Sequence, residues 1–177
     1  IVPAGIEQDF KITPEQLEAA ITPKTKAIIL CSPSNPTGSV YSREELAALA
    51  AVFERHEQVY VIADEIYEHI NYVGRHESIA QFPGVHDRVV IINGVSKAYA
   101  MTGWRIGYVA ANEEISSLIS NYLSHCISSP CAVSQKAALE AVAGSQYSVE
   151  QMRVAFERRR NYMVEHMNKI DGVSCIK

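Results

Sequence analysis

The sequence lacks several features that would assign a class of function directly. None of its apolar runs approaches the roughly 18 consecutive residues of a membrane-spanning helix, and its first residues lack the basic and apolar segments of a secretory signal peptide. Acidic side chains outnumber basic ones by 20 to 16, and the net charge of −4 leaves no basic footprint for a nucleic acid. The six histidines are scattered without metal-ligand spacing. We therefore expect no membrane insertion, no nucleic-acid partner and no metal site.

Paired cysteines and glycine-rich loops are also missing. The four cysteines form no CxxC pair and no regular framework, which predicts buried free thiols in a reducing cytoplasm; they are Cys31, Cys126, Cys131 and Cys175. No GxGxxG or GxxxxGKS/T sequence occurs. A nucleotide-binding α/β domain, which needs such a turn between a strand and a helix, is therefore not supported.

What the chain does contain is an alternation of apolar strands and amphipathic helices, with 47% hydrophobic residues overall. Apolar runs predict strands at residues 25–31, 59–63, 89–92 and 106–111. Capping residues and periodicity predict helices at residues 13–21, from 42 onward, 113–125, 132–142 and 148–167. The expected N-caps are Thr13, Ser42 (in a capping box with Glu45), Asn112 and Ser148. This pattern predicts an α/β fold with a mostly parallel sheet covered on both faces.

Three polar residues follow the ends of predicted strands, and open parallel sheets bind ligands beyond those ends. Asn35 comes after the first strand, Asp64 ends the second, and Lys97 follows the third. A lysine close to the core loses hydration, which lowers its pKa and frees its amine as a nucleophile. From position alone, a snorkelling surface lysine is the commoner interpretation of Lys97, and Asp64 could equally be a helix cap or an arginine partner.

Three motifs carry a resemblance to a known family. They are SPSNPTG at residues 32–38, ADEIY at 63–67 and GVSKAYAMTGWRIGY at 94–108. In this order and spacing the sequence resembles the class I and II aminotransferases, which are pyridoxal-phosphate enzymes of fold type I. The resemblance extends over essentially the whole chain and is strongest to the prokaryotic aspartate aminotransferase subgroup.

The resemblance implies roles for the two charged residues. Lys97 would hold pyridoxal 5'-phosphate as a Schiff base and then move the proton between the substrate α-carbon and the cofactor. Asp64 would pair with the pyridine nitrogen and keep it protonated, which makes the ring an electron sink. The activity implied is amino-group transfer between an amino acid, aspartate or a related one, and a 2-oxo acid.

The resemblance also implies four further cofactor ligands. Tyr67 and Asn35 would donate hydrogen bonds to the phenolic oxygen of the cofactor, and the Asn35–Pro36 bond is a good place for a cis peptide. Ser96 and Arg105 would bind the phosphate, because a guanidinium suits that group. We expect the bulky neighbours of Arg105, Trp104 and Ile106, to be buried, which would limit the exposure of Arg105.

Family members are about twice this length, so the resemblance implies a fragment. Residues 1–146 would be part of the large cofactor-binding domain, and residues 147–177 the start of the small domain. The parent would be a homodimer, the chain alone nearly inactive, and the arginine for the substrate carboxylate would lie beyond this sequence. The arginines of the last helix are expected to be solvated; they are Arg153, Arg158, Arg159 and Arg160.

Two alternatives retain the same motifs. Relatives with this core catalyse β-elimination, as carbon–sulfur lyases do, and they keep the same lysine, aspartate, tyrosine and arginine. A domain of a transcription regulator could instead sense pyridoxal phosphate without turnover. The sequence does not identify the amino-acid donor.

Overall fold

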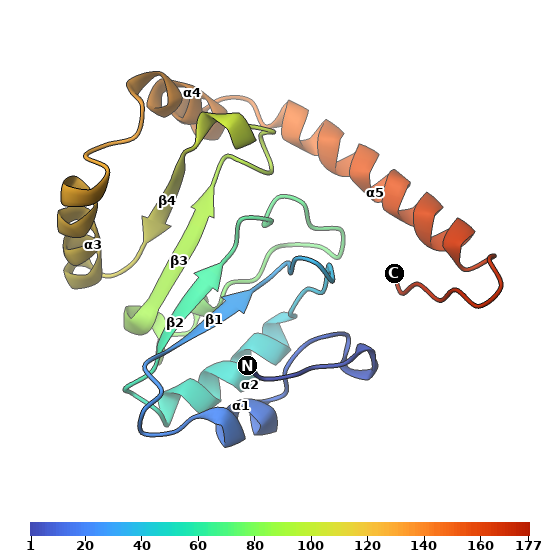
Figure 1. Ribbon diagram of the computed structural model, residues 1–177, viewed down its shortest axis with the longest axis horizontal. Helices are drawn as coiled ribbons and strands as arrows, with labels where there is room; N and C mark the ends of the chain where they lie inside the picture. Colours follow the sequence, from blue (N-terminus) through green and yellow to red (C-terminus); the bar gives the residue numbers. More distant parts are fainter.

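A four-stranded sheet forms the centre of the computed structural model, which describes all 177 residues (Figure 1). Its order is β1 (Ala27–Cys31), β2 (Tyr60–Asp64), β3 (Val89–Gly94) and β4 (Gly107–Ala110). The first three strands are parallel, and β4 runs antiparallel to β3. The predicted mostly parallel sheet is therefore confirmed, with each strand within a few residues of its expected position.

Helices α1 (Pro14–Ala20) and α2 (Arg43–Glu54) pack on one face of this sheet. Both begin at the predicted N-caps, where a side-chain oxygen of Thr13 or Ser42 accepts from a backbone N–H of the first turn. The capping box at Ser42 is confirmed, and Thr13 forms one with Gln16 as well. Leu46, Leu49 and Phe53 of α2 are almost fully buried against the strands. This single hydrophobic core fixes the position of the strand ends.

The opposite face of the sheet carries exposed apolar side chains. Ile29, Ile92 and Val109 are exposed by 74%, 40% and 39% respectively. Strand register places these residues on the same face as Asp64, because side chains alternate along a strand. Within these 177 residues, the helical covering expected on both faces is thus complete on one face only.

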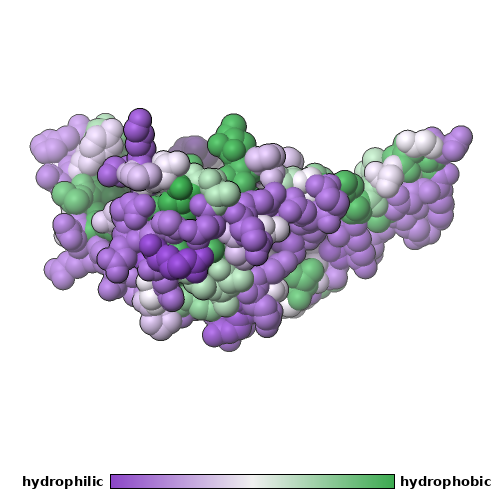
Figure 2. All heavy atoms as spheres, turned by 90° about the horizontal axis from the view of Figure 1, so that it is seen from below, coloured by the Kyte–Doolittle hydropathy of each residue, from purple (hydrophilic) through white to green (hydrophobic).

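Three further helices extend from the sheet: α3 (Glu113–Cys126), α4 (Ala132–Ala143) and α5 (Tyr147–Met167). Asn112 caps α3 as predicted. Figure 2 shows the molecule from below α1 and α2 as a mostly hydrophilic body with an arm at one side, which is the far end of α5 and the C-terminus. No helix is both long enough and apolar enough to cross a membrane.

The predicted cap of α5 is wrong, because Gln146 and not Ser148 precedes the helix and makes no side-chain cap. The Gln146 amide instead donates to the backbone carbonyls of Ala141 and Gly144. Its oxygen accepts a hydrogen bond from the Tyr99 hydroxyl. The connection between α4 and α5 is therefore determined by a side chain that binds the end of the preceding helix.

Two burial predictions also fail. The four cysteines are free, but Cys126 and Cys131 are exposed and the other two are only half-buried. Among the arginines of α5, Arg153 forms ion pairs with Glu150 and Glu157, and the Arg160 guanidinium lies 4.6 Å from the centroid of the Tyr72 ring. Only Arg158 and Arg159 are exposed as expected, because the other two find partners on α5 itself and on the loop after β2.

Candidate active site

The carboxyl ends of β1, β2 and β3 lie side by side and present the three predicted site segments at one edge of the sheet. Cys31 of β1 is paired with Asp64 of β2, which is in turn paired with Ile92 of β3. The loop with Asn35 leaves from the first of these ends, and the turn with Lys97 leaves from the third. Residues more than sixty positions apart therefore meet because parallel strands end at the same edge.

The loop after β1 is shaped by short-range backbone hydrogen bonds. The Ser34 N–H donates to the Ser39 carbonyl, and the Gly38 N–H donates to the Ser34 carbonyl, both at 2.9 Å. Gly38 has a φ of 77°, a conformation that glycine adopts without strain. The Asn35–Pro36 bond is cis as predicted, and the preceding Ser32–Pro33 bond is cis as well. The loop thereby presents the exposed side chain of Asn35 toward the turn after β2.

Asn35, Tyr67 and Lys97 form a connected group. The Asn35 Nδ2 donates to the Tyr67 hydroxyl at 3.2 Å, and the Lys97 Nζ lies 5.7 Å from the centroid of the Tyr67 ring. Tyr67 and Lys97 are both half-buried. An amine, a phenol and an amide donor thus lie next to one another, and these groups suit a ligand with an electrophilic carbon beside an oxygen anion.

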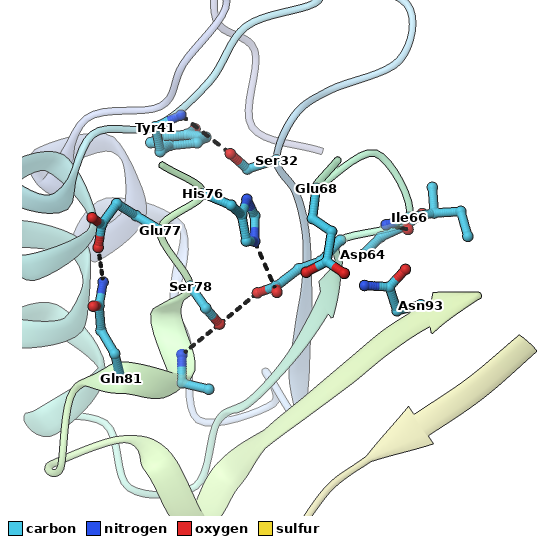
Figure 3. Close-up of polar contacts among 12 residues, drawn as sticks. Ser32, Tyr41, Asp64, Ile66, Glu68, His76, Glu77, Ser78, Gln81 and Asn93 are labelled. Atoms are coloured by element: carbon cyan, nitrogen blue, oxygen red, sulfur yellow. Dashed lines mark hydrogen bonds and ion pairs between the residues drawn. The ribbon is translucent and has the colours of Figure 1, made fainter. Parts of the chain in front are cut away.

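Asp64 lies at the adjoining strand end and is half-buried. One of its carboxylate oxygens accepts from the Ile66 N–H at 3.3 Å, and Figure 3 shows Asp64 and Ile66 near Asn93. Burial raises the pKa of the neighbouring Cys31 thiol, and the charge of Asp64 adds to this effect. The carboxylate of Asp64 accepts only that one backbone hydrogen bond, so it retains capacity for a ligand donor.

Ser96 and Arg105 follow β3, but neither contacts the group formed by Asn35, Tyr67 and Lys97 through a hydrogen bond. Ser96 is half-buried in the turn that also carries Lys97. Arg105 is exposed, and its Nη1 donates to the Thr102 carbonyl at 2.7 Å. The expectation of buried neighbours was wrong, because Trp104 is 44% exposed. No hydrogen bond joins Ser96 or Arg105 to the other predicted site residues.

Two glycines bring β3 and β4 unusually close beside this turn. Gly94 is paired with Gly107, and a Cβ built on Gly94 would lie 2.9 Å from the Gly107 Cα. Neither position has room for a side chain. Strand packing therefore explains Gly94 and Gly107 of the third motif.

Sequence reasoning missed a buried polar network directly behind Asp64. Glu65 is 6% exposed, and its carboxylate binds the His76 Nε2 at 2.9 Å and the Ser78 hydroxyl at 2.5 Å. In Figure 3 the dashed lines from His76 and Ser78 meet at an unlabelled carboxylate, which the hydrogen bonds identify as that of Glu65. The alternation of side chains along a strand could have indicated this network, because the residue after Asp64 must point to the opposite, core-facing side of the sheet.

Comparisons with known proteins agree with this arrangement. The aspartate/prephenate aminotransferase of Cereibacter sphaeroides is 51% identical over 176 residues, which cover 98% of this chain and 44% of that protein. The aspartate aminotransferase of Geobacillus stearothermophilus is likewise 51% identical over 176 residues, with the same coverage. The chain thus spans less than half the length of these curated relatives.

Solved structures give the same result. The crystal structure of the aspartate aminotransferase from Rhizobium meliloti has a TM-score of 0.95 and 42% identity, covering 98% of this chain and 44% of that one. A Thermus thermophilus aspartate aminotransferase with maleate has a TM-score of 0.89 and 40% identity, covering 95% and 44%. The predicted fold class is thereby confirmed as that of an incomplete fold type I domain.

The sequence profile described as "Aminotransferase class I and II" matches residues 1–177. Because this match covers the whole chain and agrees with both sets of relatives, the chain belongs to the class I and II aminotransferase family.

Proposed function

We propose that this chain is the cofactor-binding part of an aminotransferase that moves an amino group between aspartate, or a similar amino acid, and a 2-oxo acid. The names of the relatives support amino-group transfer, and two of them support aspartate as the donor. The Thermus thermophilus neighbour was solved with maleate, a dicarboxylate, which supports a donor with two carboxylates.

One observation carries the proposal: three motif residues from three separate loops meet at one sheet edge. Asn35 donates to Tyr67, and the amine of Lys97 lies over the Tyr67 ring. An amine beside two hydrogen-bond donors supports a site for a carbonyl compound with an adjacent oxygen. The carboxylate of Asp64 ends the strand between them.

The donor set fits pyridoxal 5'-phosphate, whose aldehyde, phenolic oxygen and pyridine nitrogen need an amine, hydrogen-bond donors and a carboxylate respectively. When bound, the cofactor supplies an electron sink for the pair of electrons left when the substrate α-proton departs. Lys97 would hold it covalently, and Asp64 would keep the ring nitrogen protonated. Tyr67 and Asn35 would donate to the phenolic oxygen.

The remaining residues would bind the phosphate and move the proton. The Ser96 hydroxyl is in the same turn as Lys97, and the exposed guanidinium of Arg105 keeps donors beyond the one used on Thr102. The Lys97 Nζ would also act as general acid–base, accepting the proton from the substrate α-carbon and delivering it to the bound cofactor.

We further propose that residues 1–146 belong to the large domain and residues 147–177 begin the small one. The break falls at Gln146, between α4 and α5. By its membership of the family, the parent protein would be a homodimer. The open face of the sheet and the short span relative to the relatives leave the site incomplete in these residues. The 177 residues alone should therefore be nearly inactive. The four free cysteines support a reducing, cytoplasmic location.

The test is an assay of the full-length protein that carries this sequence. With aspartate as donor, we expect formation of the 2-oxo acid beyond one equivalent per site only when an amino acceptor is present. Lys97→Ala should abolish it, whereas Lys169→Ala, which removes an exposed lysine of the C-terminal region, should not. Product formation beyond one equivalent per site without an acceptor would indicate elimination, and no reaction despite cofactor binding would indicate a sensing domain.

A further inference from the structure

Glu65 is the only charged residue among the buried residues of the protein. An ionised carboxylate in such a place is unfavourable unless hydrogen bonds replace its lost hydration. His76 and Ser78 supply them, at 2.9 Å and 2.5 Å. Because an ionised carboxylate only accepts, the Nε2 of His76 must carry the proton in this pair.

The backbone of Glu65 connects this network to the candidate active site. Its N–H donates to the Ile92 carbonyl of β3 at 3.0 Å, and its carbonyl accepts from the Glu68 N–H at 2.9 Å. Glu65 therefore directly continues the strand that ends at Asp64 and begins the turn that carries Tyr67. Both site residues lie within two positions of the buried carboxylate.

The other side of the network is anchored in the core. The Ser78 oxygen also accepts from the Ala80 N–H at 3.2 Å and caps the short 3-10 helix η2 (Ile79–Gln81). Ile79 is 2% exposed and belongs to the hydrophobic core. The carboxylate thus ties the start of a turn at the sheet edge to a fixed point of the core (Figure 3).

We propose that Glu65, held by His76 and Ser78, is a positioning residue that fixes the placement of Asp64 and of the Tyr67 turn. The inference rests on the proposed function for what these two residues do, but the placement itself does not need a cofactor. Loss of the carboxylate charge would loosen the turn, so that the Asp64 carboxylate and the Tyr67 hydroxyl are no longer held in the geometry the site needs.

The first test needs no cofactor. In the full-length, cofactor-free protein, Glu65→Gln and Ser78→Ala should each speed amide hydrogen exchange at Glu68 and Ile70, whose N–H groups close the turn. We expect at least about tenfold faster exchange, since hydrogen bonds to charged groups are of this strength. The matched control is Glu77→Gln, the same change at a neighbouring carboxylate that binds Gln81 and Arg43 instead. Unchanged exchange at both amides in both variants would overturn the proposal.

The second test separates positioning from a general loss of stability. With pyridoxal phosphate bound, both variants should shift the pH midpoint of the cofactor absorbance in the same direction as Tyr67→Phe, with a lower kcat and a smaller change in KM. A lower melting temperature with the wild-type midpoint and kcat would show a merely structural role and overturn the proposal. If the wild-type protein takes up no cofactor at Lys97, the proposed function fails, and hydrogen exchange alone decides whether Glu65 holds the turn.

Discussion

Tyr67→Phe removes a single oxygen atom from the centre of the candidate site and leaves the ring beneath the Lys97 amine in place. That oxygen accepts from the Asn35 amide at 3.2 Å. It makes no other hydrogen bond, so its own proton is available to a ligand oxygen. The substitution therefore separates two roles of the hydroxyl: bonding to a neighbour and donating to a ligand.

The two roles differ in expected magnitude. The bond to Asn35 joins neutral groups and should contribute only about 0.5–1.5 kcal/mol to the free energy of unfolding. Donation to an ionised cofactor oxygen should contribute about 1.5–3 kcal/mol to the transition state, which corresponds to a loss of about 10-fold to 100-fold in kcat/KM. Because Asn35 and Tyr67 would act on the same oxygen, the losses in the double variant with Asn35→Ala should not add.

The assay is steady-state kinetics of the full-length protein with aspartate and a 2-oxo acid, combined with urea unfolding of the cofactor-free form. Tyr122→Phe, at a tyrosine that is 69% exposed, is the matched control and should change neither quantity. If Tyr67→Phe lowers kcat/KM by less than about twofold, the Tyr67 hydroxyl does not donate to a ligand oxygen in the transition state, and its proposed role is wrong.

Three further predictions concern charge, core packing and pH. Asp64→Ala should lower kcat by more than about 100-fold while the protein still binds pyridoxal phosphate, as seen by kinetics and absorbance; unchanged turnover would mean that the pyridinium role is misassigned. Phe53→Ala should cost about 3–5 kcal/mol in urea unfolding because the side chain is fully buried, whereas Phe156→Ala, at a 40% exposed site, should cost under about 1 kcal/mol. Burial raises the pKa of Tyr41, whose hydroxyl oxygen accepts from the Ile12 N–H. The folded state therefore keeps this proton longer than the unfolded state, so the contribution of Tyr41 to the free energy of unfolding should be constant below about pH 10 and fall above it; Tyr41→Phe should reduce the alkaline slope of stability, and a slope unchanged from the wild type would contradict the assignment.

Features decided by neighbouring residues could be predicted from the sequence. The caps at Thr13, Ser42 and Asn112 were predicted correctly because an N-cap bonds to a backbone N–H only three residues away. Ser148 failed as a cap because Gln146 binds carbonyls of the preceding helix and so determines where α5 begins. Whether Ser148 or Gln146 precedes α5 depends on how α4 and α5 are arranged, and the local sequence pattern does not contain this information.

The site residues that directly follow the ends of strands could be predicted from the sequence. Asn35, Asp64 and Lys97 were expected beyond three neighbouring strands, and the structure places all three there. Glu65 was missed because its partners, His76 and Ser78, come from a loop whose return to the strand is a tertiary feature.

Burial was predicted less well than secondary structure. The exposure of Trp104 and of the Cys126 thiol contradicts what these residue types usually do in folded proteins. Such tendencies are averages for a residue type over many proteins. In this chain one face of the sheet is open, so its side chains are covered less than they would be in a complete core.

The most direct test of the central claim is to reduce the full-length protein with borohydride in the presence of pyridoxal phosphate and then digest it with trypsin. Arg88 and Arg105 flank a single peptide, residues 89–105, whose only lysine is Lys97. The account predicts that the reduced cofactor is attached to this peptide at Lys97 and that Lys97→Ala abolishes the label. Label spread over exposed lysines such as Lys169, with none on residues 89–105, would contradict it.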